Sequence, residues 1–355
     1  MTRLTGAVDG VIGVDPHRDT LAAAAIDPVG GLLAQTSVRA DAGGYRRLLD
    51  FAQAQVPGQR CWAVEGAGSY GAGLTSFLQA HSEWVVEVSR PKRPPRRSGA
   101  KSDALDAVRA AREALTQDHP LAPRRRGDRE ALRVLLATRR NACAANVSAI
   151  NQLKALIVGA PEELRVELRG LATKRQITRC AGPRDRPSRS LEHRMTVRAL
   201  RSTAQRIRRL AAEAAGLRAE LERLVAAVAP WLLELPGVGP ISAAQVLVSW
   251  SYAGRLRSEA AFAALAGANP IPASSGQVTR HRLNRSGDRQ LNRALHTVVV
   301  ARLRDDPATR AYAARRTAEG KSSREIRRCL KRAVARQLFK LLERHDRPAV
   351  EVIRA

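Results

Sequence analysis

Two long stretches with a seven-residue spacing of apolar side chains constrain this 355-residue chain more than any other feature. In the second stretch, both rows of a heptad are filled by Leu200, Ile207, Ala214, Leu221 and Val228, and by Thr203, Leu210, Leu217 and Leu224. The first stretch, residues 129–158, repeats at Leu136, Cys143, Ile150 and Ile157. This pattern predicts long amphipathic helices of the coiled-coil type. It leaves open whether the two helices form a hairpin within one chain or join protomers in an assembly.

The region before these helices has a different pattern, in which short apolar runs alternate with amphipathic segments. Strands are predicted at Val11–Val14, Leu21–Ile26, Leu32–Val38, Cys61–Val64 and Trp84–Ser89. Helices are predicted near Tyr45–Gln55, Ala72–Ala80 and Ser102–Leu115. Three strands followed by helix, strand, helix, strand and helix is the element order of an RNase H-like α/β domain.

The remaining sequence is predicted to be helical with interruptions. A basic break containing Gly and Pro covers Arg169–Arg189, and Pro230 ends the heptad region. A tight turn at Leu235–Pro240 precedes a short helix, and a looser segment at Gly267–Asp288 precedes the terminal helices near 289–304 and 323–344. We therefore predict three domains: an α/β domain at 1–118, an all-α coiled-coil region at 119–230 and a mainly α domain at 231–355.

The charge balance indicates the kind of partner. Sixty-one Lys and Arg against 33 Asp and Glu give a net charge of +28, and 44% hydrophobic residues are enough for folded cores. Such a chain binds polyanions, because neutralised phosphates release condensed counterions. Aromatic residues make up only 3%, which argues against a stacking platform for single strands. The four cysteines lack CxxC spacing, and no apolar run is long enough to span a membrane, so we expect a cytoplasmic protein without a membrane partner.

Acidic residues stand at the ends of two predicted strands and at the start of a predicted helix. Asp15 follows the first strand, Glu65 follows the fourth, and Asp103 and Asp106 share one helix face because they are three positions apart. Carboxylates gathered in this way repel one another unless cations lie between them, and Mg²⁺ prefers such oxygen ligands, with Mn²⁺ as a substitute. Each acid alone is explained equally well as a turn former or a helix-dipole partner.

Several motifs, in this order along the chain, resemble those of the DEDD-type insertion-sequence transposases, also called bridge-RNA-guided recombinases. The N-terminal motifs are Gly13-Val14-Asp15, Glu65-Gly66-Ala67-Gly68-Ser69-Tyr70 and Lys101-Ser102-Asp103-Ala104-Leu105-Asp106-Ala107. The C-terminal motifs are Leu235-Pro236-Gly237-Val238-Gly239, Gly267-Ala268-Asn269-Pro270, Ser274-Ser275-Gly276, Arg285-Ser286-Gly287 and Leu291-Asn292-Arg293-Ala294-Leu295. The resemblance implies a RuvC-like N-terminal domain whose metal ligands are Asp15, Glu65, Asp103 and Asp106.

The resemblance also implies a nucleophilic serine. In such proteins a serine before a glycine, a few residues beyond a Gly-x-x-Pro turn, attacks DNA, and here that serine is Ser275. The implied reaction cleaves double-stranded DNA through a phosphoserine link and rejoins the strands. A non-coding guide RNA, a dimeric or tetrameric assembly and a place at the bacterial nucleoid are further implications.

Basic and glycine residues provide candidate nucleic-acid contacts in the C-terminal region. Arginines suited to phosphate binding flank the serine at Arg280, Arg282, Arg285 and Arg289. Gly237 and Gly239 resemble the hairpin of a helix–hairpin–helix motif, in which backbone amides approach a phosphate. A plain tight turn between packed helices explains the two glycines nearly as well. His17, two residues after Asp15, is interpreted as a loop residue without a catalytic role.

Two other functions remain compatible with the sequence. A structure-selective nuclease would use the same acids to activate water, with Ser275 as a turn residue. A non-enzymatic architectural protein would use only the charge, and it leaves the ordered acids unexplained.

Overall fold

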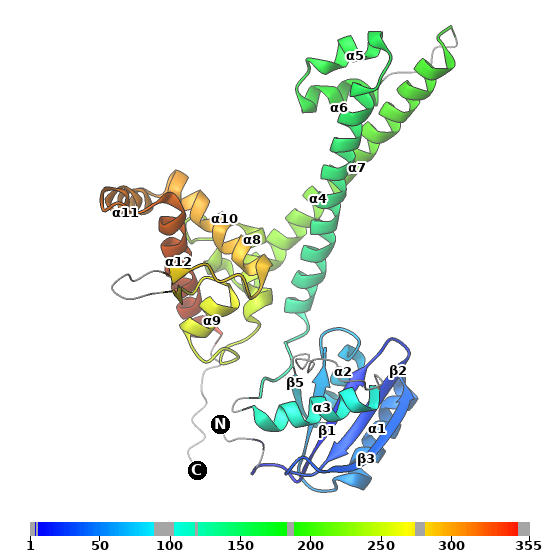
Figure 1. The fold of residues 1–355 in the computed structure, drawn as a ribbon, viewed down its shortest axis with the longest axis vertical. Coiled ribbons are helices and arrows are strands. Elements are labelled where there is room, and N and C mark those ends of the chain that lie inside the picture. The colour runs from blue at the N-terminus through cyan, green and yellow to red at the C-terminus, as the bar shows by residue number, and fades with distance from the viewer. Residues whose placement is uncertain are drawn as a thin grey trace. The chain divides into compact units, whose positions relative to one another are not determined.

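The computed structural model describes residues 4, 6–88, 103–117, 120–182, 188–273 and 281–346. The chain divides into two compact units, residues 1–125 and 126–355 (Figure 1). No described helix combines the length and apolarity needed to cross a lipid bilayer.

The first unit is a mixed α/β domain built on a five-stranded sheet. The strand order is β3-β2-β1-β4-β5; β1, β2 and β3 pair antiparallel, and β1, β4 and β5 pair parallel. The strands are β1 (Gly10–Pro16), β2 (Thr20–Ile26), β3 (Leu32–Arg39), β4 (Arg60–Glu65) and β5 (Trp84–Val88). The helices are α1 (Ala42–Gln55), α2 (Ala72–Ala80) and α3 (Asp103–Thr116). The mixed α/β class and the order of the elements agree with the prediction.

The central strands are buried on both faces, and their side chains alternate between two cores. Ile12 and Val14 pack with residues of α1 and α2. Val11 and Ala63 lie in the other core, which the alanines of α3 complete. Helix α3 crosses one face of the sheet in Figure 1. Side chains at odd positions of β1 therefore point towards α3, since successive side chains of a strand point to opposite faces.

The second unit is helical and contains two apolar cores. Its first helices are α4 (Asp128–Val158), α5 (Glu162–Arg169), α6 (Thr173–Ala181) and α7 (Leu191–Val228). They are followed by the 3₁₀ turn η1 (Pro230–Leu232), α8 (Pro240–Trp250), α9 (Glu259–Leu265), β6 (Ile271–Pro272), β7 (His281–Arg282), α10 (Arg289–Asp305), α11 (Pro307–Ala318) and α12 (Ser323–His345). A helical C-terminal region is as predicted, whereas α6 lies inside the predicted break and α5, α9 and α11 were not predicted.

Helices α4 and α7 pack along each other as an antiparallel hairpin within one chain (Figure 1). At one end, Leu153 and Ile207 share a core with α5 and α6. At the other end, Leu136 and Leu221 join the core of the C-terminal helices. Between these cores Ala214 is only half-buried. The hairpin matches one of the two predicted arrangements, and a coiled-coil assembly of protomers stays a prediction.

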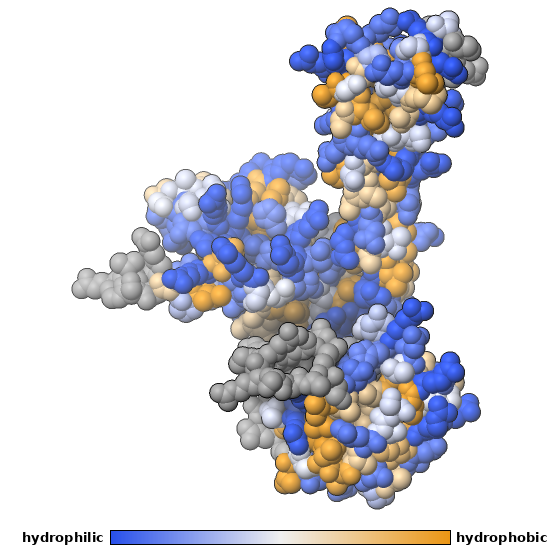
Figure 2. Space-filling view, turned by 45° about the vertical axis from the view of Figure 1, so that its right-hand side comes forward, coloured by the Kyte–Doolittle hydropathy of each residue, from blue (hydrophilic) through white to orange (hydrophobic). Residues whose placement is uncertain are grey.

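The described surface of the second unit is largely hydrophilic in the view of Figure 2, with scattered apolar patches, some of them along the hairpin. Two of the exposed apolar residues lie on α4, where Val134 is 47% exposed and Val147 is 59% exposed.

Candidate metal centre

Asp15 and Glu65 lie side by side at the carboxyl ends of two neighbouring strands. Asp15 lies near the end of β1 and Glu65 ends β4, and the two strands run parallel with Val14 opposite Val64. By strand alternation, both acids fall on the sheet face that α3 covers. Asp15 and Glu65 therefore lie at the carboxyl ends of neighbouring parallel strands; that both bind a metal stays a prediction.

A glycine lets α3 lie directly on β1. Gly13 has no side chain, and a Cβ at this position would lie 2.0 Å from the carbonyl oxygen of Ala107 and 2.8 Å from the Cβ of Ala111. Both alanines are fully buried. The helix therefore approaches the strand more closely than any side chain at position 13 would allow, which places its first turn beside the end of β1.

This approach gathers Asp15, His17 and Asp103 into one cluster. Each offers a ligand atom, and these atoms all lie within 4.8 Å of one another. The Nε2 atom of His17 is 3.1 Å from Oδ1 of Asp103 and 3.5 Å from Oδ2 of Asp15. The Asp15 side chain is 11% exposed, whereas that of Asp103 is 49% exposed. The cluster thus has one acid held in the sheet and one at a surface open to solvent.

The other two predicted acids are not part of this three-residue group. Glu65 is half-buried beside Asp15, at the next strand end. Asp106 is on the same helix as Asp103, and its Oδ1 accepts a 2.7 Å hydrogen bond from Nη1 of Arg109. Both aspartates also lie in the first turn of α3, where a negative charge compensates unsatisfied backbone amides.

The donor set of the cluster fits a divalent cation. Carboxylate oxygens suit hard cations, and an imidazole nitrogen is a ligand for borderline transition metals. The Nε2 atom of His17 is buried and forms no hydrogen bond within the described part of the chain, although it lies between two carboxylates. A buried nitrogen without a hydrogen-bond partner, facing acidic oxygens, is an arrangement that a bound cation would satisfy.

His17 is the member of the cluster that sequence reasoning set aside. Its backbone N–H donates to the carbonyl oxygen of Thr20, so the chain stays in the β1–β2 pairing beyond Pro16. The spacing of two residues from Asp15 was the available signal, because alternation in an extended chain puts both side chains on one face.

Ser275 and Arg280 lie outside the described residues. The residues on either side of segment 274–280 are joined by hydrogen bonds, and we call this joined region the hairpin base. The side-chain amide of Asn284 donates to Oδ1 of Asn269 at 2.6 Å, and Asn292 donates to the carbonyl oxygen of Ala266 at 2.6 Å. The two short strands β6 and β7, which flank the segment, pair antiparallel next to the hairpin base.

Among the remaining predicted nucleic-acid contacts, Arg282, Arg285 and Arg289 are exposed. Gly237 has a positive φ of 74°, and a Cβ there would lie 2.8 Å from the carbonyl oxygen of Val298. Packing against α10 therefore accounts for Gly237. A Cβ at Gly239, the residue before α8, would meet nothing within 4 Å.

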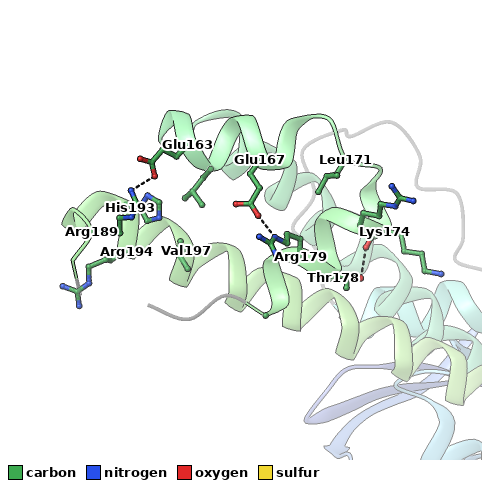
Figure 3. Close-up of a pocket in the computed structure, with 13 residues that line it drawn as sticks. Glu163, Glu167, Leu171, Lys174, Thr178, Arg179, Arg189, His193, Arg194 and Val197 are labelled. Carbon is green, nitrogen blue, oxygen red and sulfur yellow. Dashed lines mark hydrogen bonds and ion pairs between the residues drawn. The ribbon is translucent and has the colours of Figure 1, made fainter. Parts of the chain in front are cut away.

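A cavity of about 1020 Å³ lies among α5, α6 and the start of α7 (Figure 3). None of its lining residues was predicted as a site residue. Two of its arginines are paired with acids, because Nη1 of Arg189 is 2.6 Å from Glu163 and Arg179 pairs with Glu167. These pairs offset part of the positive charge of the cavity.

Comparison with known proteins identifies relatives of both units. Residues 12–160 match a family of DEDD-type transposases related to IS110, and residues 229–314 match the transposase family IS116/IS110/IS902. A similar protein is an uncharacterized 43.6 kDa protein of insertion element IS110 from Streptomyces coelicolor, 34% identical over 129 residues. That similarity covers 36% of this chain and 32% of the relative. The two family matches together cover more than half of the chain.

Proposed function

Because this chain belongs to the IS110 family of DEDD-type transposases, we propose that it is a DNA recombinase that cleaves and rejoins DNA strands. Its N-terminal unit is, in this proposal, a RuvC-like domain of the RNase H fold. The single observation that carries the proposal is the convergence of Asp15, His17 and Asp103 from two separate segments of the chain. A purely structural acid would not need an opposing acid at this distance.

The carboxylates of Asp15 and Asp103 would hold a divalent cation, Mg²⁺ or its substitute Mn²⁺, with Glu65 and Asp106 as further ligands. When bound, such a cation polarises a phosphodiester and lowers the pKa of an attacking hydroxyl. His17 would orient the two carboxylates from between them. The half-exposed side of the cluster, at Asp103, is where a DNA strand would approach.

The proposed nucleophile is Ser275, on the basis of its family motif. Its Oγ would form a bond to phosphorus while the bond from phosphorus to the leaving deoxyribose oxygen breaks. The serine proton would pass to solvent or a neighbouring base, and the leaving oxygen would take up a proton from solvent to become a hydroxyl. Attack by a hydroxyl of a second strand on the phosphoserine would reverse these changes. The energy of the original phosphodiester bond would thus be conserved in the new one. Metal or base activation is needed, because a serine hydroxyl is a weak nucleophile.

The guide RNA and the assembly of protomers are also part of the proposal. The net charge of +28 suits both DNA and RNA. Exposed Val134 and Val147 on the α4–α7 hairpin offer apolar surface for contact with another protomer.

The proposal is tested with full-length protein, element-end DNA, Mg²⁺ and any co-encoded RNA. We expect Asp103→Asn and Asp15→Asn to abolish strand cleavage and to weaken Mn²⁺ binding measured by electron paramagnetic resonance. Ser275→Ala should abolish a covalent protein–DNA adduct and leave Mn²⁺ binding intact. Asp19→Asn is the matched control, because Asp19 is an 81% exposed acid of the same unit, paired with its neighbour Arg18.

The rival functions give different results in the same experiment. Cleavage that survives Ser275→Ala and still needs Asp103 would identify a nuclease that uses water. DNA binding that is unchanged by removing Mg²⁺ and by replacing the four acids, with no cleavage product under any condition, would identify a non-enzymatic basic binding protein.

A further inference from the structure

A second cavity, of about 700 Å³, lies between the base of the β6–β7 hairpin and helices α11 and α12. We call it the α12 pocket. Its lining is dominated by cations, namely Arg282, Arg316, Lys321, Arg328, Lys331, Arg332 and Arg336. Of these, only Arg282 was predicted as a nucleic-acid contact.

The acids near the α12 pocket neutralise only part of this positive charge. Glu325 is the one acidic residue among the described lining, and it accepts hydrogen bonds from the Ser322 hydroxyl at 2.7 Å and from its backbone N–H at 2.9 Å as a helix cap. Glu259, outside the pocket, pairs with Arg332 at 3.0 Å and with Arg336 at 2.9 Å.

Four lining cations remain after Arg316 is paired with Glu319, and Arg332 and Arg336 with Glu259. These four, Arg282, Lys321, Arg328 and Lys331, have no acid within ion-pair distance in the described part of the chain. Glu325 attracts Lys321 and Arg328 at longer range, so one acid faces four cations. The excess positive charge is local, because it remains after the neighbouring acids have been assigned.

The floor of the pocket contains a buried lysine. Lys331 is 8% exposed, and its Nζ donates a 3.2 Å hydrogen bond to Oδ1 of Asn292, a neutral acceptor. Burial, and after it the charge of Arg328, lower the pKa of Lys331. The pKa of the nearby His296 is lowered in the same way, by burial and then by Lys331 and Arg327. An anion in the pocket would offset the smaller of these two causes, the repulsion between neighbouring cations.

Lys331 is also tied to the base of segment 274–280. The Asn292 that accepts from Lys331 donates to the carbonyl oxygens of Ala266 and Gly267, at 2.6 and 3.3 Å. Gly267 has a φ of 59°, and a Cβ there would lie 2.8 Å from the carbonyl oxygen of Ser286. The pocket wall and the hairpin base are thus one packed structure.

We propose that the α12 pocket binds a backbone phosphodiester of DNA, with Lys321 and Arg328 as the contacting cations and Lys331 as a buried positive charge beneath them. The ligand assignment rests on the proposed function, since DNA is its substrate. RNA carries the same phosphodiester, and the experiment below separates the two.

The first test compares two double variants in full-length protein. Lys321→Gln, just before α12, together with Arg328→Gln in α12 removes two charges from the pocket. Arg324→Gln with Arg327→Gln removes two exposed charges of α12 that do not line the pocket. Binding of a labelled DNA duplex and a labelled RNA hairpin is followed by fluorescence anisotropy at several salt concentrations, with EDTA present. Circular dichroism checks that both variants are folded.

We expect the pocket variant to bind the duplex roughly tenfold more weakly, and the control variant to be weakened less than about threefold. The slope of log K against log salt should fall by about 0.9 for each phosphate that the variant no longer neutralises. A selective weakening for the RNA hairpin alone would assign the pocket to RNA and overturn the DNA assignment. If the two variants weakened the binding of both probes equally, the proposal that the α12 pocket binds a nucleic-acid phosphodiester would be overturned.

The second test needs no variant. Cys329 is exposed and lines the α12 pocket, whereas Cys61 is buried in the first unit. We expect saturating duplex to slow alkylation of Cys329 by iodoacetamide several-fold, as followed by mass spectrometry, and Cys61 to stay unlabelled throughout. Unchanged alkylation of Cys329 with bound duplex would contradict the proposal. Both tests are done without divalent metal, so their failure is distinguishable from a failure of strand cleavage.

Discussion

Replacing Gly13 by alanine tests whether the contact between α3 and β1 builds the metal centre. The added Cβ would lie 2.0 Å from the backbone oxygen of Ala107 and 2.7 Å from the backbone nitrogen of Ala111. Ordinary contact begins near 3.4 Å, and neither atom belongs to a flexible side chain. Helix α3 must therefore move by more than about 1 Å, and overpacking of this kind typically costs about 1–3 kcal/mol.

Hydrogen exchange measured by mass spectrometry on the full-length protein is the appropriate assay, because it reports on β1 and α3 separately from the second unit. A cost of about 1–3 kcal/mol corresponds to a loss of protection of roughly five- to hundredfold in both elements. Because α3 carries Asp103, the displacement should also weaken Mn²⁺ binding.

Gly43→Ala is the control for this prediction. Gly43 lies in α1 of the same unit, and its added Cβ would have Asp41 Oδ1 at 3.4 Å and Arg47 Nη1 at 3.5 Å as its nearest atoms. A helical alanine is more favourable than glycine by up to about 1 kcal/mol, so protection should stay level or rise. If Gly13→Ala behaves like this control, the close approach does not set the position of Asp103.

Three further predictions concern stability. Glu83→Gln should destabilise the first unit by about 3 kcal/mol in urea unfolding followed by hydrogen exchange, because it removes the charge partner of the nearly buried Arg60; an unchanged midpoint would contradict this. Burial raises the pKa of the Cys61 thiol from 9.0 to about 12. The stability contributed by the buried thiol is therefore fully present below pH 9.0 and is lost as the pH rises towards 12. The free energy of unfolding should fall by up to about 1.4 kcal/mol per pH unit in this range. Cys61→Ala should therefore show a shallower alkaline loss in unfolding free energy than the parent, and parallel curves would refute the assignment. Ser322→Ala should lower the local hydrogen-exchange protection of α12 by about 1 kcal/mol, because it removes the helix cap. It should also lessen the loss of that protection on acidification, because the Ser322 hydroxyl holds the pKa of Glu325 below its usual value. Protection equal to that of the parent at every pH would exclude the cap.

The sheet and its acids were predictable because their signals are local. Buried parallel strands need continuous apolar runs such as Val11–Val14, and an acid directly after such a run lies at the carboxyl end of the strand. The antiparallel pairing of β2 and β3 is set by the turn at Asp27, whose Oδ1 accepts hydrogen bonds from the backbone N–H groups of Val29 and Gly31 at 3.0 and 2.7 Å. The α/β class therefore follows from features a few residues long.

The helices missed by the prediction lack that kind of local signal. Helix α6 lies in the basic break at Arg169–Arg189, where charge and flanking glycines hide one apolar face. That face is buried only because Cys180 packs into the core at the end of the hairpin. Helix α11 has a single buried residue, Thr309, and begins where Asp306 caps it. Tertiary packing decides such segments, and a single sequence does not display it.

The membership of the metal cluster was predictable only in part, for a geometric reason. Strand order brings Asp15 beside Glu65, but the third ligand depends on how closely α3 approaches the sheet, which Gly13 and the alanines of α3 determine. The same approach decides that Asp103 faces His17, whereas Asp106, three residues later, is hydrogen-bonded to Arg109. Exchange of a small residue at this helix–strand contact is thus expected to alter the metal centre without touching a ligand. Substitutions of Ala107 and Ala111 should follow Gly13 in this respect, since all three hold the same two backbones together.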